Sequence, residues 1–495
     1  MSWILRKLYG YLHFLRLLTV LWKISVKKMI RTYGSANEAL RASFLTLAML
    51  CIALVPMCIG SNLSKEFAPY ILAIYTLLGF SVFWIKGSAL TILSPNSLVF
   101  FYSTISLILG SVAFKFDAVL VTRNLADFQN HQHTDSAFTF IMIGLTFFPL
   151  IEVVHKSVFV NQYTDIRFSK SHLAVLSMLT LPLVVLNVDL AMVGGAGSLS
   201  PYLLSLVSIA CLIFASKFTR FTRLIIYMLT FATMVSIFSQ DKRVAIFLLL
   251  VISLLEARRG AFILNFKGLV FVILIIVAAL YAILLMSINR GYGGYVQAEG
   301  VIAASSFVLD YMKSDIFLAG FFQNIEVSYF YFHYLNAAEL VFSGKVELAL
   351  GSTLIKPLFL PFPRDILPWK PSGIIDLYTF VHDPAFRLLG GSWPPNFAAE
   401  YLWNFHVFGL ILFPILATIN AVFFRVLLSR YTEVNPFFMV FMLFAYMNVL
   451  TYARGSGLDL IAFLLIIAGV FTLFAASVHE TLRFAVRNNS MASHA

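Results

Sequence analysis

The sequence has few charged side chains and few cysteines for its length. Only 12% of its 495 residues are charged and three are cysteines, whereas 60% are hydrophobic. Soluble globular proteins carry about a quarter charged residues, and the mean hydropathy of +0.89 is far above their range. Cys51 and Cys58 lie about 10 Å apart along one apolar run, too far for a disulfide. The composition therefore excludes a soluble fold and predicts an integral membrane protein.

Acidic residues are scarcer than basic ones, with 23 Asp and Glu against 35 Lys and Arg and a formal charge of +12. In a membrane protein such an excess reflects basic cytoplasmic loops, so no nucleic-acid partner is predicted. Basic and large apolar residues are mixed over residues 1–41, before the first clean apolar run. This pattern predicts an amphipathic segment on the cytoplasmic surface rather than a cleaved signal peptide.

Apolar runs long enough to cross a bilayer recur along the chain and predict an all-α polytopic membrane protein with about twelve transmembrane helices. Lys and Arg gather in every second connection when the N-terminus is placed inside, so both termini are predicted to be cytoplasmic. The predicted spans lie near residues 42–61, 67–85, 95–114, 137–154, 173–193, 200–216, 223–239, 243–257, 267–288, 401–425, 436–453 and 457–479. The predicted organisation is therefore a surface segment at 1–41, nine spans within 42–288, an extracytoplasmic loop at 289–400, three spans within 401–480 and a cytoplasmic tail at 481–495.

The extracytoplasmic loop at 289–400, between the ninth and tenth spans, is much longer than the other connections. Phe321, Ile325, Tyr329 and Phe332 recur at helical spacing, which predicts amphipathic helices rather than strands. Closely spaced prolines from Pro357 onward predict a series of turns. Aromatic side chains throughout the loop favour a position on the bilayer interface.

Three arginines are predicted at the outer ends of spans, where the positive-inside rule disfavours them: Arg243, Arg290 and Arg454. Each one alone is explained by snorkelling to lipid phosphates or by pairing with a carboxylate such as Asp459. Taken together, and with Arg364 and Lys370 in the loop, they favour a shared anionic ligand, because guanidinium groups bind phosphate oxygens bidentately.

Two loop residues are candidates for acid–base catalysis. His382 could act as a general base and Glu400 as an acid or a base, since both lie where a polar substrate would meet the interface. The alternatives are a solvated histidine and a carboxylate that serves a helix N-terminus. His131, His133 and Asp135 suggest metal ligands, but a solvated loop is favoured, and no metal site is predicted.

The motifs around the large loop resemble those of Wzy-type polymerases, which join oligosaccharide repeat units of the O-antigen and enterobacterial common antigen. The resemblance covers mainly residues 239–459 and rests on the order and spacing of five motifs. These are Lys242-Arg243 at the start of a span, Arg290-Gly-Tyr-Gly, the proline-rich Pro361 to Pro371, the run from Asn396 to Gly409, and Arg454-Gly-Ser-Gly-Leu-Asp459.

This resemblance implies a glycosyltransferase of the C-type (GT-C) fold in the bacterial inner membrane. Such an enzyme would move a glycan from undecaprenyl diphosphate onto the next carrier-linked repeat unit at the periplasmic face. Arg243, Arg290 and Arg454 would hold the diphosphate, and Arg364, Lys370 and Arg387 would contact the glycan. His382 or Glu400 would be the base.

Two other functions remain open from the sequence: a lipid-linked oligosaccharide flippase and an O-antigen ligase. A flippase of this size usually has internal repeats and polar groups at mid-membrane, whereas the polar motifs here lie at the outer edge. The ligase differs from the polymerase in its acceptor. The predicted partners are undecaprenyl-diphosphate-linked oligosaccharide and membrane lipids, with a polysaccharide chain-length regulator as a further candidate. No cofactor motif is visible in the sequence.

Overall fold

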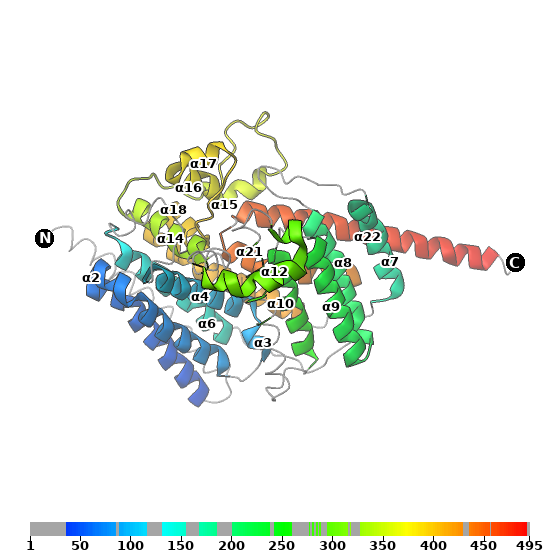
Figure 1. Cartoon of the computed structure of the whole chain (residues 1–495), viewed down its shortest axis with the longest axis horizontal. Helices are drawn as coiled ribbons and strands as arrows, with labels where there is room; N and C mark the ends of the chain where they lie inside the picture. Colours follow the sequence, from blue (N-terminus) through cyan, green and yellow to red (C-terminus); the bar gives the residue numbers. More distant parts are fainter. Residues whose placement is uncertain are drawn as a thin grey trace.

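The structure is a computed structural model that describes residues 36–85, 89–115, 131–154, 168–185, 200–237, 242–259, 295–314, 327–428, 435–455 and 457–492, with a few single positions between 277 and 317. Within these residues every regular element is a helix and there is no strand, which confirms the all-α prediction. Figure 1 shows the arrangement of the helices.

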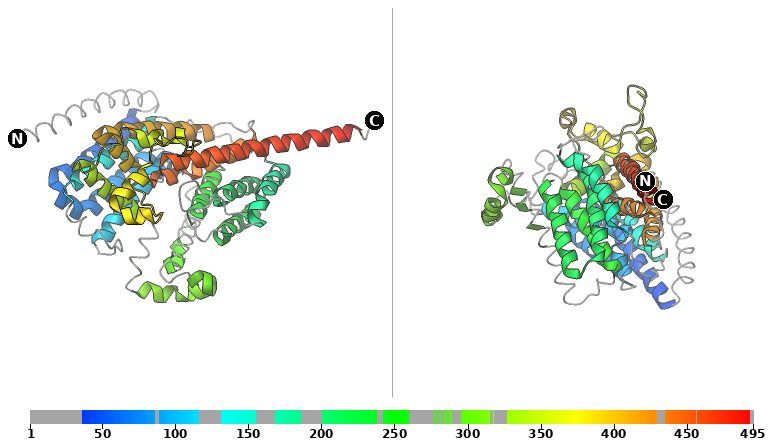
Figure 2. Two further views of the ribbon diagram at one scale, coloured as in Figure 1. Left: turned by 90° about the horizontal axis from the view of Figure 1, so that it is seen from above. Right: turned by 90° about the vertical axis from the view of Figure 1, so that its right-hand side faces the viewer.

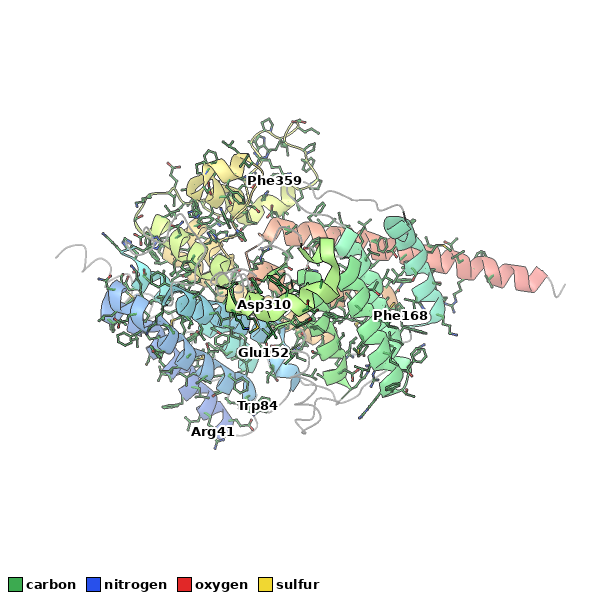
Figure 3. The ribbon with its side chains drawn as sticks, in the orientation of Figure 1. Arg41, Trp84, Glu152, Phe168, Asp310 and Phe359 are labelled. Carbon is green, nitrogen blue, oxygen red and sulfur yellow. The ribbon has the colours of Figure 1, made fainter. Side chains whose placement is uncertain are left out.

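The first described helix, α2 (Ala36–Trp84), consists of two arms that meet at Gly60. Gly60 has φ 81° and ψ 169°, a conformation that is open essentially to glycine alone. Arg41 and Trp84, near the two ends of α2, lie at the same end of the molecule in Figure 3, so the chain reverses at Gly60. The arms correspond to the first two predicted spans.

Six helical stretches in the described residues are long and apolar enough to cross a membrane: Leu40–Trp84, Pro95–Lys115, Thr134–Val154, Phe397–Leu428, Pro436–Ala453 and Leu458–Val486. The protein is therefore a polytopic helical membrane protein by length and composition of its helices. Four further helices occupy the fifth to eighth predicted windows: α7 (Lys170–Val185), α8 (Ser200–Phe214), α9 (Arg220–Ile237) and α10 (Lys242–Arg258). Most of the ninth window lies outside the described residues, so twelve spans stay a prediction.

The remaining helices of the N-terminal half are α3 (Ala89–Ile92), α4 (Pro95–Lys115), α6 (Thr134–Val154) and the short η1 (Ala215–Lys217). The large loop contains α12 (Tyr295–Lys313), α14 (Val327–Phe342), α15 (Ser352–Ile355), η2 (Lys356–Phe359), α16 (Ile374–His382) and α17 (Pro384–Leu388). After it come α18 (Phe397–Phe405), η3 (His406–Ile411), α19 (Leu412–Leu428), α20 (Pro436–Met447), α21 (Val449–Ala453) and α22 (Leu458–Ala492). In Figure 2, α12 lies apart from the main body and α22 extends beyond the other helices.

The tenth predicted span, 401–425, is not one continuous helix. It begins earlier, in α18, and breaks where His406 takes a positive φ of 52°. The chain then runs through η3 before α19 continues. Gly409 within η3 packs on the backbone of α18, where a Cβ would lie 2.3 Å from the Tyr401 carbonyl oxygen. The hydropathy pattern does not reveal the break because the segment stays apolar across it.

Helix α14 of the large loop is embedded in the bundle instead of resting on its surface. Tyr331 and Tyr334 are fully buried, and the Tyr334 hydroxyl donates to the Ala137 carbonyl of α6 at 2.5 Å. At the end of α14, Glu339 accepts from the backbone N–H of His133 at 2.9 Å and lies 3.1 Å from its Nδ1. The described part of the loop is helical, as predicted, although Phe321 and Ile325 of the predicted pattern lie outside the described residues. The burial of α14 was not predicted, and the position of the loop on the bilayer interface stays a prediction.

Candidate functional site: a loop cluster at the start of the last helix

The turn between α21 and α22 docks directly against the start of α18. Gly455 in this turn has φ 94°, and a Cβ there would lie 2.1 Å from the Asn396 Cα. Asn396 caps α18, since its Oδ1 accepts from the Ala399 N–H at 2.8 Å. Only a glycine allows this approach. The contact brings the Arg454–Asp459 motif beside the helix that carries Glu400.

A chain of ion pairs fastens the large loop to this turn. The Lys356 Nζ lies 2.6 Å from Asp459 Oδ2 and 3.6 Å from Asp376 Oδ2. The other oxygen of Asp376, Oδ1, lies 2.6 Å from Arg387 Nη2. The chain thus links η2, α16 and α17 to the beginning of α22. Asp459, considered from sequence as a partner for an arginine, pairs with a lysine of the loop.

Lys356 and Asp376 were not predicted as site residues. Neither belongs to a motif, and each acquires its partner only through the folding of the loop. Arg387 was predicted to contact glycan, whereas in the structure it forms an ion pair with Asp376 and donates to the Gly391 carbonyl at 3.3 Å. This ion pair places Arg387 to orient Asp376. The predicted contact of Arg387 with glycan stays a prediction.

We expect Lys356→Met to release the loop from the start of α22. The change leaves the Asp376 and Asp459 carboxylates near each other without the cation between them, which should cost about 1–3 kcal/mol for partly buried groups. Limited proteolysis of the purified protein should cut residues 360–372 faster, and the thermal midpoint should fall. Lys345→Met, at an exposed lysine, is the matched control. Equal proteolysis of the two variants would contradict the fastening role.

Two of the predicted cations, Arg364 and Lys370, bond to polar groups of their own loop. Lys370 Nζ donates to the Phe362 carbonyl at 2.9 Å, and Arg364 Nη2 donates to the Ser372 hydroxyl at 3.2 Å. Partial loss of hydration lowers the pKa of Lys370, with the positive charges of Lys356 and Arg364 adding to the effect and Asp459 opposing it. Lys356 and Arg364 both lie within electrostatic reach of Lys370, and we call these three residues the cation cluster.

Glu400 lies buried beside the ion-pair chain, with 1% of its surface exposed. Its Oε1 accepts from the Thr353 hydroxyl at 2.8 Å, and Thr353 in turn accepts from Asn404 Nδ2 at 2.7 Å. The Gly351 N–H donates to Asn404 Oδ1 at 2.8 Å and fixes the orientation of that amide. Glu400 Oε2 has no hydrogen-bond partner within the described part of the chain. Lys356 and Asp459 are close enough to act on the carboxyl electrostatically.

Glu400 is not the residue that caps its own helix. Although Glu400 is in the first turn of α18, the helix is capped by Asn396, and Glu400 bonds to a side chain of the loop instead. Thr353 holds one oxygen in place, and the other, Oε2, is buried without a hydrogen-bond partner among the described residues. A positioned carboxylate with one free oxygen is suited to general acid–base chemistry.

His382 lies in a separate network of aromatic and amide groups. Asn336 Nδ2 lies 2.8 Å from His382 Nδ1 and also donates to the Tyr378 hydroxyl at 3.1 Å. The Tyr378 hydroxyl lies 2.8 Å from Nδ1 of His333. Burial, together with the nearby His382, holds the pKa of His333 well below its usual value. With Asn336 as donor, His382 Nδ1 is an acceptor and its proton sits on Nε2. His382 is therefore better placed to donate a hydrogen bond than to remove a proton.

The three predicted diphosphate-binding arginines can be placed only in part. Arg454 ends α21 and is half-buried beside Gly455. Arg243 is the second residue of α10, but its side chain is outside the described residues, and Arg290 is outside them altogether. Whether the three meet stays a prediction.

Comparison with known proteins found no matching family model, no matching curated protein and no matching solved structure. Among the described residues there is no group of three or more His, Cys, Asp or Glu side chains placed to hold a metal ion. His133, one of the residues that suggested metal ligands, pairs with Glu339.

Proposed function

We propose that the protein polymerises undecaprenyl-diphosphate-linked oligosaccharide repeat units by glycosyl transfer at the outer face of the bacterial inner membrane. The observation that carries the proposal is a buried carboxyl, Glu400, whose Oε2 has no hydrogen-bond partner among the described residues and which lies within electrostatic reach of Lys356. Arg454 lies next to Gly455, which packs on Asn396 of the same helix. Glycosyl transfer from a lipid diphosphate needs both features. Positive groups must stabilise the departing diphosphate, and an acceptor hydroxyl must lose its proton.

In the proposed step, a hydroxyl of one repeat unit attacks the anomeric carbon of the glycan carried by a second lipid diphosphate. Its proton passes to Glu400 Oε2 as the new carbon–oxygen bond forms. The bond from the anomeric carbon to the phosphate oxygen breaks, and the electron pair leaves with the diphosphate. Lys356 and Arg454 stabilise the added negative charge, while the Nε2–H of His382 donates to the glycan.

The test is an assay with the purified protein in nanodiscs and undecaprenyl-diphosphate-linked repeat units, with products resolved on a gel as a ladder. The wild type should produce the ladder. Absence of product together with movement of labelled lipid across vesicles would contradict the proposal and support a flippase. Transfer only onto a lipid A core acceptor would support the ligase.

We expect Arg454→Ala to reduce ladder formation about 100-fold, the scale found for removing one donor to a developing anion. Arg290→Ala should act in the same direction if Arg290 joins the same site. Arg454→Lys should recover part of the activity, because it keeps the charge and loses the bidentate fork. Arg483→Ala, at an arginine 74% exposed on α22, serves as the control. Unchanged activity in a folded Arg454→Ala protein would remove Arg454 from the site.

A further inference from the structure

The segment at residues 357–371, which we call the apolar loop, exposes large apolar side chains. Leu358 is 74% exposed, Ile366 67%, Trp369 66% and Phe362 46%. The loop projects from the body near Phe359 (Figures 1 and 3). Soluble surfaces rarely place so many large apolar groups together unless they bind a partner.

Internal bonds of the apolar loop brace its conformation. The rings of Phe359 and Trp369 pack edge to face with their centroids 5.2 Å apart, and so connect the beginning and the end of the loop. Lys370 Nζ spans the loop to the Phe362 carbonyl, and the Leu367 N–H donates to the Pro363 carbonyl at 3.0 Å. The conformation is therefore braced from within, and the exposure of its apolar side chains is built into it.

The base of the apolar loop is fixed at the end of a candidate membrane span. Lys356, the residue before the loop, contacts Asp459, the second residue of α22. The apolar stretch Leu458–Val486 of α22 is long enough to cross a bilayer. The loop therefore starts where lipid headgroups would surround the end of α22, within reach of the same leaflet.

The charges of the apolar loop are those of an interfacial segment. Arg364 and Lys370 are basic, Asp365 is its one acidic residue, and Trp369 directly precedes Lys370. Tryptophan beside a basic residue is typical of the boundary between headgroups and acyl chains. This combination fits a phospholipid surface better than a polar glycan or an acidic protein.

We infer that the apolar loop inserts into the leaflet beside the start of α22. Leu358, Phe362, Ile366 and Trp369 enter the acyl region, and Arg364 and Lys370 contact lipid phosphates. The inserted loop anchors the ion-pair chain, and the neighbouring Thr353 that holds Glu400, to the membrane surface. The inference does not depend on the reaction proposed above.

The test uses the full-length protein in nanodiscs of phosphatidylethanolamine and phosphatidylglycerol, without any lipid-linked sugar. Cys51, Cys58 and Cys211 are first replaced by serine or alanine. A polarity-sensitive dye is then attached to the cysteine of an Ile366→Cys protein. A second protein, Glu347→Cys, is labelled in the same way as an exposed polar control. Nitroxide-labelled lipids report contact with the bilayer, and aqueous iodide reports contact with water. Because the discs hold only phospholipid, a signal cannot come from a substrate diphosphate.

We expect the dye at position 366 to emit at shorter wavelength than at 347, with quenching by nitroxide lipids at least about twofold stronger and weaker quenching by iodide. Iodide quenching equal to that at position 347 would overturn the inference. Protection from iodide without quenching by nitroxide lipids would also overturn it, and would indicate a protein surface. Both labelled proteins must elute as a single species, so that a folding defect is recognised.

Discussion

Replacement of Glu400 by glutamine is expected to abolish the polymer ladder, with a loss of activity of about 100-fold or more. Glutamine keeps the shape of the side chain and can still accept from the Thr353 hydroxyl, as Glu400 Oε1 does at 2.8 Å. It cannot accept a proton from the acceptor hydroxyl. The initial rate of ladder formation in nanodiscs is the measurement, and binding of the lipid-linked substrate should change little.

Two further variants separate a catalytic role of Glu400 from a structural one. Thr353→Val removes the hydroxyl that positions Glu400 and should give an intermediate loss of rate, because the carboxylate remains but is held less firmly. Glu347→Gln, at an exposed carboxylate of the same loop, should be neutral. A folded Glu400→Gln protein with normal activity would show that another group, or water, takes the proton.

The second large effect is expected for Gly455→Ala, which should destabilise the site and remove most of the activity. At φ 94° an L-residue is strained by about 1–2 kcal/mol. The added Cβ would also lie 2.1 Å from the Asn396 Cα and 2.2 Å from its N. Because both obstacles are backbone atoms, α18 must move away, taking Glu400 with it.

Gly390→Ala is the matched control for this prediction. Gly390 has φ 81°, but nothing lies within 4 Å of a Cβ built there, so this substitution adds strain without a clash. The thermal midpoint and the ladder assay should therefore show a much larger loss for Gly455→Ala. Equal losses in the two variants would mean that the contact of Gly455 with Asn396 does not hold the site together.

The ion-pair chain connects the loop to the start of α22. Lys356 contacts Asp459 of a membrane helix, while Asp376 and Arg387 extend the chain outward. If the apolar loop inserts into lipid, it connects the bilayer surface to the segment that holds Glu400. A lipid-linked substrate would approach along that surface and would meet the apolar loop on its way to Glu400.

The candidate site was predictable only in part, and His382 and Glu400 show why. Their types and their position in or at the end of the predicted extracytoplasmic loop mark both as acid–base candidates. The choice between them depends on hydrogen bonds across the loop: Asn336 reaches His382 over 46 residues and Thr353 reaches Glu400 over 47. Sequence spacing carries no information on which nitrogen of a histidine accepts or which carboxylate oxygen stays free.

The polytopic helical character followed from hydropathy alone, because only helices satisfy their own backbone hydrogen bonds over the length of a single apolar segment in lipid. The reversal near Gly60 and the helices of the large loop also followed from local patterns of apolar residues. Tertiary structure alone decided the partners of Lys356 and Asp376, the burial of α14 and the close approach of Gly455 to Asn396. These features join residues far apart in the chain. The sequence shows that a buried charge needs a partner and that a glycine permits close packing, but it does not show which distant segment provides the partner or packs there.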